Sequence, residues 1–215
     1  MSLLFVDPPQ PTAHEAFAVD AVWLRGFAMD AAPTLLTAVE MILQQAPPRH
    51  MLTPGGQRMS VCNTNCGPLG WVSDRRGYRY EACDPQTGKS WPAMPAGLPE
   101  LADCAARAAG FASFEPDACL VNVYTPGMRM GLHQDRDERD FSAPIVSLSL
   151  GLPATFLFGG ATRKDKPRRI ALLHGDVVVW GGASRLFFHG IAPLAEGEHR
   201  LTGRRRINLT LRKAR

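Results

Sequence analysis

Short runs of alternating hydrophobic and polar positions follow one another along the second half of the chain, from residue 118 onward. Glycine and proline interrupt these runs, for example at Pro126-Gly127, Gly159-Gly160 and Gly181-Gly182. The pattern predicts strands at Ala118–Tyr124, Met128–Gln134, Pro144–Leu150, Ala154–Phe158, Arg168–Leu173, Asp176–Trp180, Ser184–Ile191 and Arg206–Leu211. Short strands at this spacing, with little helix between them, are typical of an all-β sandwich or barrel. Their number fits a double-stranded β-helix, the jelly-roll arrangement.

Two segments of the first half have helical periodicity instead. Asp30–Gln45 and Pro99–Ala109 are the predicted helices. The apolar positions of the first form a stripe along one helical face: Leu35, Leu36, Val39, Ile42 and Leu43. We expect both helices to support the sheet and to carry no chemistry. The expected fold class is therefore mainly β with flanking helices (α+β).

Between the predicted helices, glycine and proline cut residues 50–97 into short pieces, as expected of a mobile cover over a site. Arginines are interleaved there with Trp71, Tyr78 and Tyr80. Aromatic rings stack on bases and arginines neutralise phosphates, so the segment suits a flexible nucleic-acid strand. We expect a single domain over residues 1–215. Residues 1–117 would hold the helices and a nucleotide-recognition lid at about 50–97, and residues 118–215 the catalytic core.

Composition agrees with this organisation. A chain of 215 residues with 45% hydrophobic residues is long enough for one domain with a substantial core. The formal net charge of +4 suits a polyanionic partner, although many proteins without such a partner share it. Basic residues gather in Arg163–Arg169 and in Arg204–Arg206. Each cluster is equally well interpreted as a solvated loop.

Cysteine usage and the shortness of the apolar runs bear on location. The five cysteines are odd in number and lack Cys-x-x-Cys spacing, which favours a reducing compartment without structural zinc. The apolar run Leu3–Val6 is far too short for a signal peptide, and no run approaches the length that spans a bilayer. We therefore expect a cytoplasmic protein with no membrane partner.

His133-Gln134-Asp135, followed much later by His189, is the candidate metal site. Two histidines and a carboxylate form a facial triad, which holds non-haem Fe(II) and leaves positions open for other ligands. Residues two apart on a strand point to the same face, so His133 and Asp135 can reach one metal. The same ligand set also binds zinc with a water. A rival pair, His174-Gly175-Asp176, has the pattern of a turn between two strands, which favours the first pair.

Polar side chains share one face of two predicted strands. The last strand carries Arg206, Asn208, Thr210 and Arg212 on this face. The first carries Asn122 and Tyr124. Such faces either meet water or line the mouth of the barrel. In the second case an arginine could hold a dicarboxylate through a bidentate fork, which lysine cannot form.

Several motifs extend this pattern over essentially the whole chain. They are Asn122-Val123-Tyr124, His133–Glu138, Val146–Gly151, His174–Gly182, Phe188-His189-Gly190 and Arg206–Arg212, with Met51–Gly56, Thr64–Trp71 and Trp91–Pro95 upstream. In sequence and spacing they resemble the AlkB family of Fe(II)- and 2-oxoglutarate-dependent dioxygenases, and its bacterial type in particular. The chain departs from the family pattern at Gln57 and Asn63, where an aromatic and an apolar residue are expected. These departures bear on lid contacts and substrate preference.

The resemblance assigns residues to three roles. His133, Asp135 and His189 would form the catalytic iron site. The residues that would bind 2-oxoglutarate are Asn122, Tyr124, Arg206, Asn208 and Arg212. The residues that would face the substrate are Trp71, Tyr78, Asp137 and Arg163.

The resemblance also implies an activity. The chain would demethylate 1-methyladenine and 3-methylcytosine by oxidation, consuming 2-oxoglutarate and O₂ and releasing formaldehyde, succinate and CO₂. Alkylated single-stranded DNA would be the main partner, with duplex DNA and RNA as further candidates, and the protein would be a monomer. Two alternatives stay open at this point. One is a 2-oxoglutarate oxygenase of a protein or small molecule, and the other is a nucleic-acid-binding module without catalysis.

Overall fold

A computed structural model describes residues 4–5 and 13–215, so the run Leu3–Val6 lies partly outside the described residues. The first half contains β1 (Leu4–Phe5), β2 (His14–Ala18), β3 (Ala21–Leu24), α1 (Ala32–Gln45), β4 (Arg49–Leu52), β5 (Arg58–Cys66), β6 (Gly70–Asp74), β7 (Gly77–Glu81) and α2 (Leu98–Ala108). The second half contains β8 (Ala118–Tyr124), β9 (Met130–His133), β10 (Ile145–Gly151), β11 (Ala154–Phe158), β12 (Arg168–Leu172), β13 (Val177–Trp180), β14 (His189–Ile191), β15 (Glu198–His199) and β16 (Arg206–Arg212).

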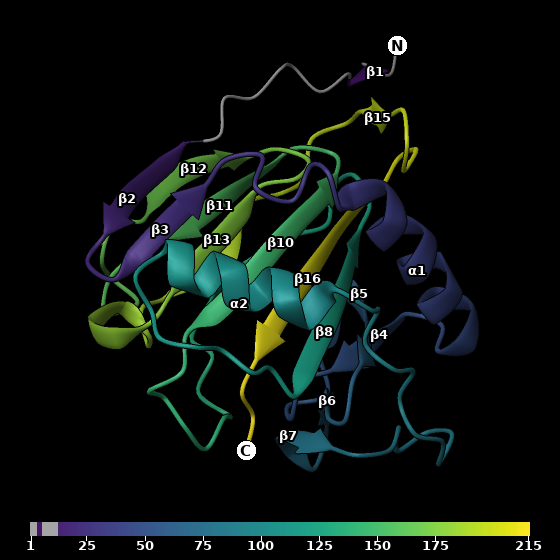
Figure 1. Ribbon diagram of the computed structural model, residues 1–215. Helices are drawn as coiled ribbons and strands as arrows, with labels where there is room; N and C mark the ends of the chain where they lie inside the picture. Colours follow the sequence, from purple (N-terminus) through teal and green to yellow (C-terminus); the bar gives the residue numbers. More distant parts are fainter. Residues whose placement is uncertain (1–3, 6–12) are drawn as a thin grey trace.

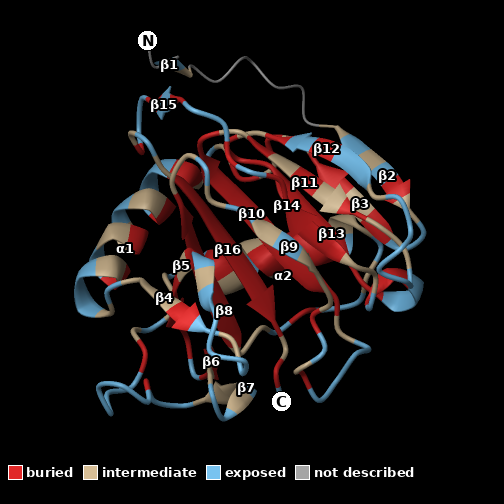
Figure 2. Cartoon of the chain, turned by 180° about the vertical axis from the view of Figure 1, so that it is seen from behind, coloured by how far each residue is buried: buried red, intermediate tan, exposed pale blue. Residues whose placement is uncertain are grey.

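Two sheets build the jelly roll. The larger has eight strands in the order β2-β3-β13-β10-β16-β8-β5-β4, and the smaller has four in the order β12-β11-β14-β9. Helices α1 and α2 lie against one face of the large sheet (Figure 1). Seen from behind, buried residues are concentrated in the central strands β10, β13 and β16 (Figure 2). The mainly β fold with flanking helices, predicted from the sequence, is confirmed.

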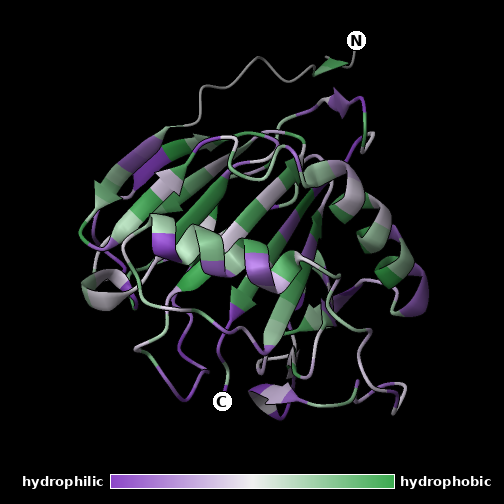
Figure 3. Ribbon diagram, in the orientation of Figure 1, coloured by the Kyte–Doolittle hydropathy of each residue, from purple (hydrophilic) through white to green (hydrophobic). Residues whose placement is uncertain are grey.

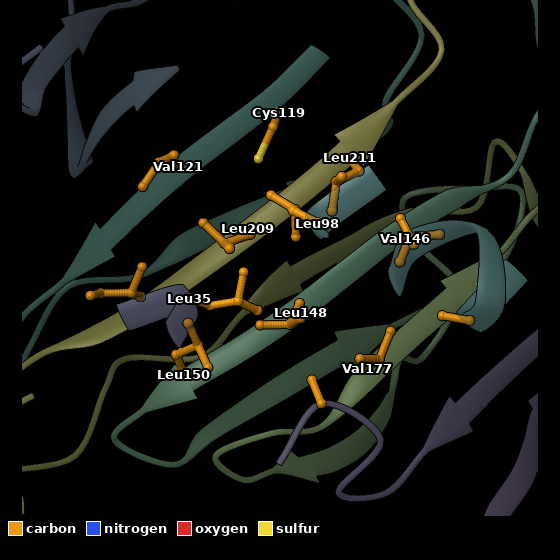
Figure 4. Packing of buried hydrophobic residues seen from close by; sticks show 14 of the residues in the cluster. Leu35, Leu98, Cys119, Val121, Val146, Leu148, Leu150, Val177, Leu209 and Leu211 are labelled. Atoms are coloured by element: carbon orange, nitrogen blue, oxygen red, sulfur yellow. The ribbon is translucent and has the colours of Figure 1, made fainter. Parts of the chain in front are cut away.

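Hydrophobic packing on the two faces of the large sheet fixes this arrangement. On the helix side, Leu35 of α1 and Leu98 of α2 pack with Leu148 and Leu209 in one buried cluster (Figure 4). The helices are amphipathic, and α2 shows both strongly hydrophilic and hydrophobic residues along its length (Figure 3). On the other side, a second cluster that includes Phe156 joins the small sheet to the large one. Burying a large apolar side chain typically contributes about 1.5–3 kcal/mol, so these contacts are the main support of the fold.

Most predicted elements agree with the structure to within two residues, but one predicted strand is largely wrong. Only its end, His189–Ile191, is a strand, although Ser184–Ile191 was expected. A short 3₁₀ helix at Gly182–Ser184 takes its place. The Ser184 hydroxyl donates to the carbonyl of Val19, and this tertiary contact holds the turn against the strand pattern.

The large sheet also recruits strands from before residue 118. Strands β2 and β3 extend one edge, and β5 and β4 extend the other. Strand β5 lies within residues 50–97, so part of the segment expected to form a lid belongs to the sheet. The hairpin of β6 and β7 forms its own two-stranded sheet beside it. Among the described helices, none has the length and apolar character needed to cross a membrane.

Candidate active site

A cavity of about 600 Å³ opens between the two sheets. Its walls come from both sheets and from the β6–β7 hairpin. Every site residue predicted from the sequence lines it: Trp71, Tyr78, Asn122, Tyr124, His133, Asp135, Asp137, Arg163, His189, Arg206, Asn208 and Arg212. Ligand sites are typically concave and a few hundred Å³ in volume, so one ligand pocket brings these residues together.

The candidate metal ligands meet at one end of this cavity. His133 of β9 and His189 of β14 are partners across the small sheet, and their ring centroids are 4.4 Å apart. Asp135 follows just beyond β9, in the loop after the predicted strand. One donor atom from each of the three residues lies within 4.8 Å of the others. Among the described residues, no other group of three or more histidine, cysteine, aspartate or glutamate side chains has this geometry.

Hydrogen bonds orient the imidazole rings for metal binding. Nδ1 of His133 lies 3.0 Å from the carbonyl of Gly131, and Nδ1 of His189 lies 3.0 Å from that of Phe187. A carbonyl only accepts, so each Nδ1 carries the proton and each Nε2 keeps its lone pair. Both Nε2 atoms lie 3.6 Å from a carboxylate oxygen of Asp135. Desolvation, and then the neighbouring His189, lower the pKa of His133 to about 4, which favours the neutral ligand form.

Asp135 is held by a buried network of charges. Arg212 donates to Oδ2 of Asp135 from Nε and Nη2, at 3.0 and 2.8 Å. Although burial alone would raise it, the pKa of Asp135 is held well below its usual range, chiefly by Arg212. Arg185 donates to the backbone carbonyl of Asp135 at 2.7 Å and pairs with Glu138 at 3.1 Å. Sequence reasoning missed Arg185 and Glu138, because no local pattern shows that they meet here.

The rival pair is part of the framework. Asp176 is fully buried and accepts hydrogen bonds from the Trp23 indole and from the backbone nitrogens of Gly26 and Leu173. Burial raises the pKa of its carboxyl group. Nδ1 of His174 accepts a hydrogen bond from the backbone nitrogen of Gly151. These contacts join β3 and β10 to the turn before β13.

A buried arginine occupies the inner part of the cavity. Arg206 is 1% exposed, and its Nη2 donates to the hydroxyl of Ser149 at 3.0 Å. Among residues 4–5 and 13–215, no group forms a hydrogen bond with its Nε or Nη1. Burial lowers the pKa of its guanidinium group, whose central carbon lies 5.0 Å from the ring centroid of Tyr124. A buried cation with free donors is costly unless an anion joins it, so this position fits a ligand carboxylate such as that of 2-oxoglutarate.

The substrate-side residues lie at the other wall. The rings of Trp71 and Tyr78 stack, with their centroids 5.6 Å apart and an angle of 13° between their planes. The Trp71 indole donates to Asp137 at 2.8 Å, and burial raises the pKa of that carboxyl group. The Tyr80 hydroxyl donates to Glu138 at 2.5 Å, so two hydrogen bonds tether the β6–β7 hairpin to the loop after Asp135.

The arginines near this wall differ in their availability. Arg163 is exposed, and its guanidinium lies 5.2 Å from the ring centroid of Phe188. Arg58, Arg75 and Arg76 are exposed as well. Arg79 pairs instead with Asp74 and Glu81 inside its own hairpin. Its charge is therefore compensated, which the interleaved sequence pattern did not indicate.

Comparison with known proteins places the chain among oxygenases. The family model of the 2OG-Fe(II) oxygenase superfamily matches residues 20–212. The alpha-ketoglutarate-dependent dioxygenase AlkB of Escherichia coli is 56% identical over 94% of this chain and 93% of its own length. The tRNA demethylase abh1 of Schizosaccharomyces pombe is 32% identical over 68% of this chain and 53% of its own length. The solved structure of OsALKBH1 superposes with a TM-score of 0.82 at 27% identity, covering 94% of this chain and all of that one.

Proposed function

The chain belongs to the AlkB family of 2OG-Fe(II) oxygenases, and on that premise we propose that it demethylates 1-methyladenine and 3-methylcytosine in single-stranded DNA. Its relatives at high identity are Fe(II)- and 2-oxoglutarate-dependent dioxygenases, and this chain is an enzyme of that class. The observation that carries the proposal is the cavity itself. It joins three residues that could hold a metal, a buried arginine that pairs with no anionic side chain of the described residues, and an aromatic wall.

His133, Asp135 and His189 would hold Fe(II), and the buried Arg206 would bind the distal carboxylate of 2-oxoglutarate. Iron, 2-oxoglutarate and O₂ together supply the oxidation of an N-methyl group to a hydroxymethyl group, which leaves as formaldehyde while 2-oxoglutarate becomes succinate and CO₂. Arg212 keeps Asp135 ionised and aimed at the two histidines. The carbonyls of Gly131 and Phe187 fix both rings.

The aromatic wall supports a methylated base as substrate. A methyl group on N1 of adenine or N3 of cytosine makes the base cationic and blocks its pairing edge. Because its pairing is already lost, turning the base out of the stack costs little free energy. Trp71 can hold such a base by stacking and cation–π attraction. Asp137, hydrogen-bonded to Trp71, can offset its positive charge.

The remaining parts of the proposal rest on fewer observations. We propose duplex DNA and RNA as further substrates. The cavity would hold only the methylated base, and the rim of the cavity would contact the rest of the strand. The β6–β7 hairpin would act as the lid, since it contributes Trp71 and Tyr78 to the cavity. We propose a cytoplasmic monomer, because one chain supplies all the predicted site residues and its five cysteines are free.

The test is formaldehyde release from single-stranded DNA that carries 1-methyladenine or 3-methylcytosine, with Fe(II) and 2-oxoglutarate present.

Trp71→Ala should weaken binding of methylated strands, because base–aromatic stacking contributes about 1–3 kcal/mol per base. The same variant should keep slow 2-oxoglutarate decarboxylation without substrate, because Arg206 and the metal ligands are unchanged. Consumption of 2-oxoglutarate without formaldehyde from methylated DNA or RNA would instead support an oxygenase of a protein or small molecule. Absence of both activities would support a non-catalytic nucleic-acid-binding module.

A further inference from the structure

Asn63 of β5 belongs to the wall of the cavity. It is 1% exposed and lines the cavity together with Trp71 and Tyr78. It lies opposite Asn122 of β8, which in turn lies opposite Asn208 of β16. Three asparagine side chains therefore form a row across three neighbouring strands, on the face that lines the cavity.

A backbone carbonyl fixes the orientation of the amide groups in this row. Nδ2 of Asn208 donates to the carbonyl of Leu148 at 3.0 Å and to the hydroxyl of Ser147 at 2.8 Å. A carbonyl oxygen cannot donate, so the amide nitrogen of Asn208 must face it. The Oδ1 atom of Asn208 then points the other way and accepts from Nδ2 of Asn122 at 3.1 Å.

The same constraint passes to the next strand. Because Nδ2 of Asn122 faces Asn208, its Oδ1 faces β5 and accepts from Nδ2 of Asn63 at 2.6 Å. The amide nitrogen of Asn63 is thereby committed to Asn122. Its Oδ1 is buried and has no hydrogen-bond partner in the part of the chain that the structure describes. Turning the Asn63 amide over would bring two acceptor oxygens together, so a residue of the cavity wall holds a hydrogen-bond acceptor in a fixed orientation.

The co-substrate does not match this acceptor. The two carboxylates and the ketone of 2-oxoglutarate offer only acceptor oxygens. A buried acceptor without a partner is costly, so the ligand that completes the site should bring a donor. A base with an exocyclic amine next to its methylated ring nitrogen brings one. A base with a carbonyl group in place of the amine would bring its carbonyl oxygen against Oδ1 of Asn63, and the two acceptors would repel each other.

We propose that Asn63 determines base specificity, by accepting a hydrogen bond from the exocyclic amine of the methylated base. The inference rests on the proposed function and names the residue that selects amino bases over carbonyl bases. Selection by such a group is strong in general, because a site built to form a hydrogen bond rejects ligands that leave it unpaired.

A matched pair of substrates tests this. 3-Methylcytosine and 3-methyluracil differ at position 4 by an amine against a carbonyl, and each is placed in the same single strand. For Asn63→Leu, the ratio of kcat/KM for 3-methylcytosine over 3-methyluracil should fall by at least about tenfold, because both the attraction and the repulsion are lost. The KM for 2-oxoglutarate should stay within about twofold. Equilibrium binding of the two strands to the metal-free protein should show the same loss of preference, and Asn63→Ala provides a second variant.

Thr64→Val is the control. Thr64 neighbours Asn63 on β5 and is equally buried, and no described residue forms a hydrogen bond with its hydroxyl. It points to the opposite side of the sheet, so its removal should leave the base preference unchanged.

The outcomes separate the two claims. If the wild-type protein demethylates 3-methylcytosine and Asn63→Leu keeps the wild-type preference, the role of Asn63 is wrong and the proposed function stands. A higher KM for 2-oxoglutarate with equal loss on both substrates would make Asn63 a positioning residue for Asn122, which also overturns the inference. If the wild-type protein releases formaldehyde from neither strand nor from 1-methyladenine, the proposed function fails and the inference fails with it.

Discussion

Single residues of the cavity owe their chemistry to partners that are distant in the sequence. His133 and His189 become a pair only because β9 and β14 are neighbours in the small sheet. Arg206 has no anionic partner among the described residues, and the side chains that it contacts, Ser149 and Tyr124, are neutral. Each of these residues can therefore be tested by its own substitution.

Removal of either histidine should abolish Fe(II) binding while the fold persists. His133→Ala and His189→Ala each delete one of the three candidate ligands, and the backbone pairing of β9 with β14 does not depend on either ring. Anaerobic calorimetric titration with Fe(II) measures the effect. His174→Ala is the comparison, and it should keep metal binding despite lower stability. Metal binding that survives His133→Ala but is lost in His174→Ala would show that the wrong pair was chosen.

Replacement of Arg206 should weaken the binding of 2-oxoglutarate by at least tenfold. Removing one partner of a buried charge pair typically costs on the order of 2–5 kcal/mol. Arg206→Lys should recover only part of the affinity, because an ammonium group cannot form the bidentate fork. Titration of the metal-loaded protein with 2-oxoglutarate measures both variants, and unchanged affinity in Arg206→Ala would falsify the assignment.

At the scale of elements, apolar and polar residues alternate along β16, so the two faces of this strand have different roles. Its apolar residues Leu209 and Leu211 pack toward the helices, while Arg206, Asn208 and Arg212 face the cavity. Strand β5 follows the same rule, with Asn63 on the cavity side and Thr64 opposite. The edge strand β4 has a different anchor. Arg49 forms two hydrogen bonds to Asp84, a buried carboxylate beyond the β6–β7 hairpin.

This anchor should give the protein a pH-dependent contribution to stability. Burial alone would raise the pKa of Asp84, but hydrogen bonds from Arg49 and the Gln86 backbone hold it below the ordinary 3.8. A carboxyl group with a lowered pKa in the folded state stabilises that state above the ordinary pKa, and the contribution is lost as pH falls through the folded pKa. At neutral pH, Asp84→Asn should therefore reduce the free energy of unfolding by about 1–3 kcal/mol.

Urea denaturation at several pH values checks this expectation. The difference between the wild type and Asp84→Asn should shrink as pH falls below about 3.8. A difference that stays constant into the acid range would mean that packing, and not the ion pair, explains the loss.

The molecule as a whole carries a formal net charge of +4, and part of that charge lies at the cavity mouth. Arg129, Arg136 and Arg163 are exposed and line the cavity. Helix α2, which carries Arg107, lies on the other face of the large sheet (Figure 1). Strand binding should therefore depend on the arginines of one face.

Added salt should weaken the binding of single-stranded DNA steeply. Each phosphate contact changes the slope of log K against log salt by about 0.7 for single strands. Arg163→Ala should reduce the slope by about that amount, equally for all sequences. Arg107→Ala changes the net charge equally but lies on α2, paired with Asp103, and should leave the slope unchanged. Equal effects of the two substitutions would indicate that net charge, and not a defined strand path, controls binding.

The sequence by itself determined the features that depend on local periodicity and residue type. Both helices follow from their apolar stripes, and β8, β11 and β16 follow from alternation and from the glycine and proline breaks. The candidate metal ligands were identifiable because His133 and Asp135 lie two residues apart and the strand context favours them over His174 and Asp176. Arg206 was identifiable because alternation places it on a polar strand face.

Only the tertiary structure decided the contacts between distant segments. It showed that Arg212 pairs with Asp135, that Arg79 is neutralised in its own hairpin, and that Arg185 holds the loop of Asp135. It also brought β5 into the large sheet, which leaves Asn63 with a free acceptor. A hydrogen bond or an ion pair depends on distance and direction between two side chains. Composition and spacing give neither this distance nor this direction for residues that the fold brings together from far apart in the chain.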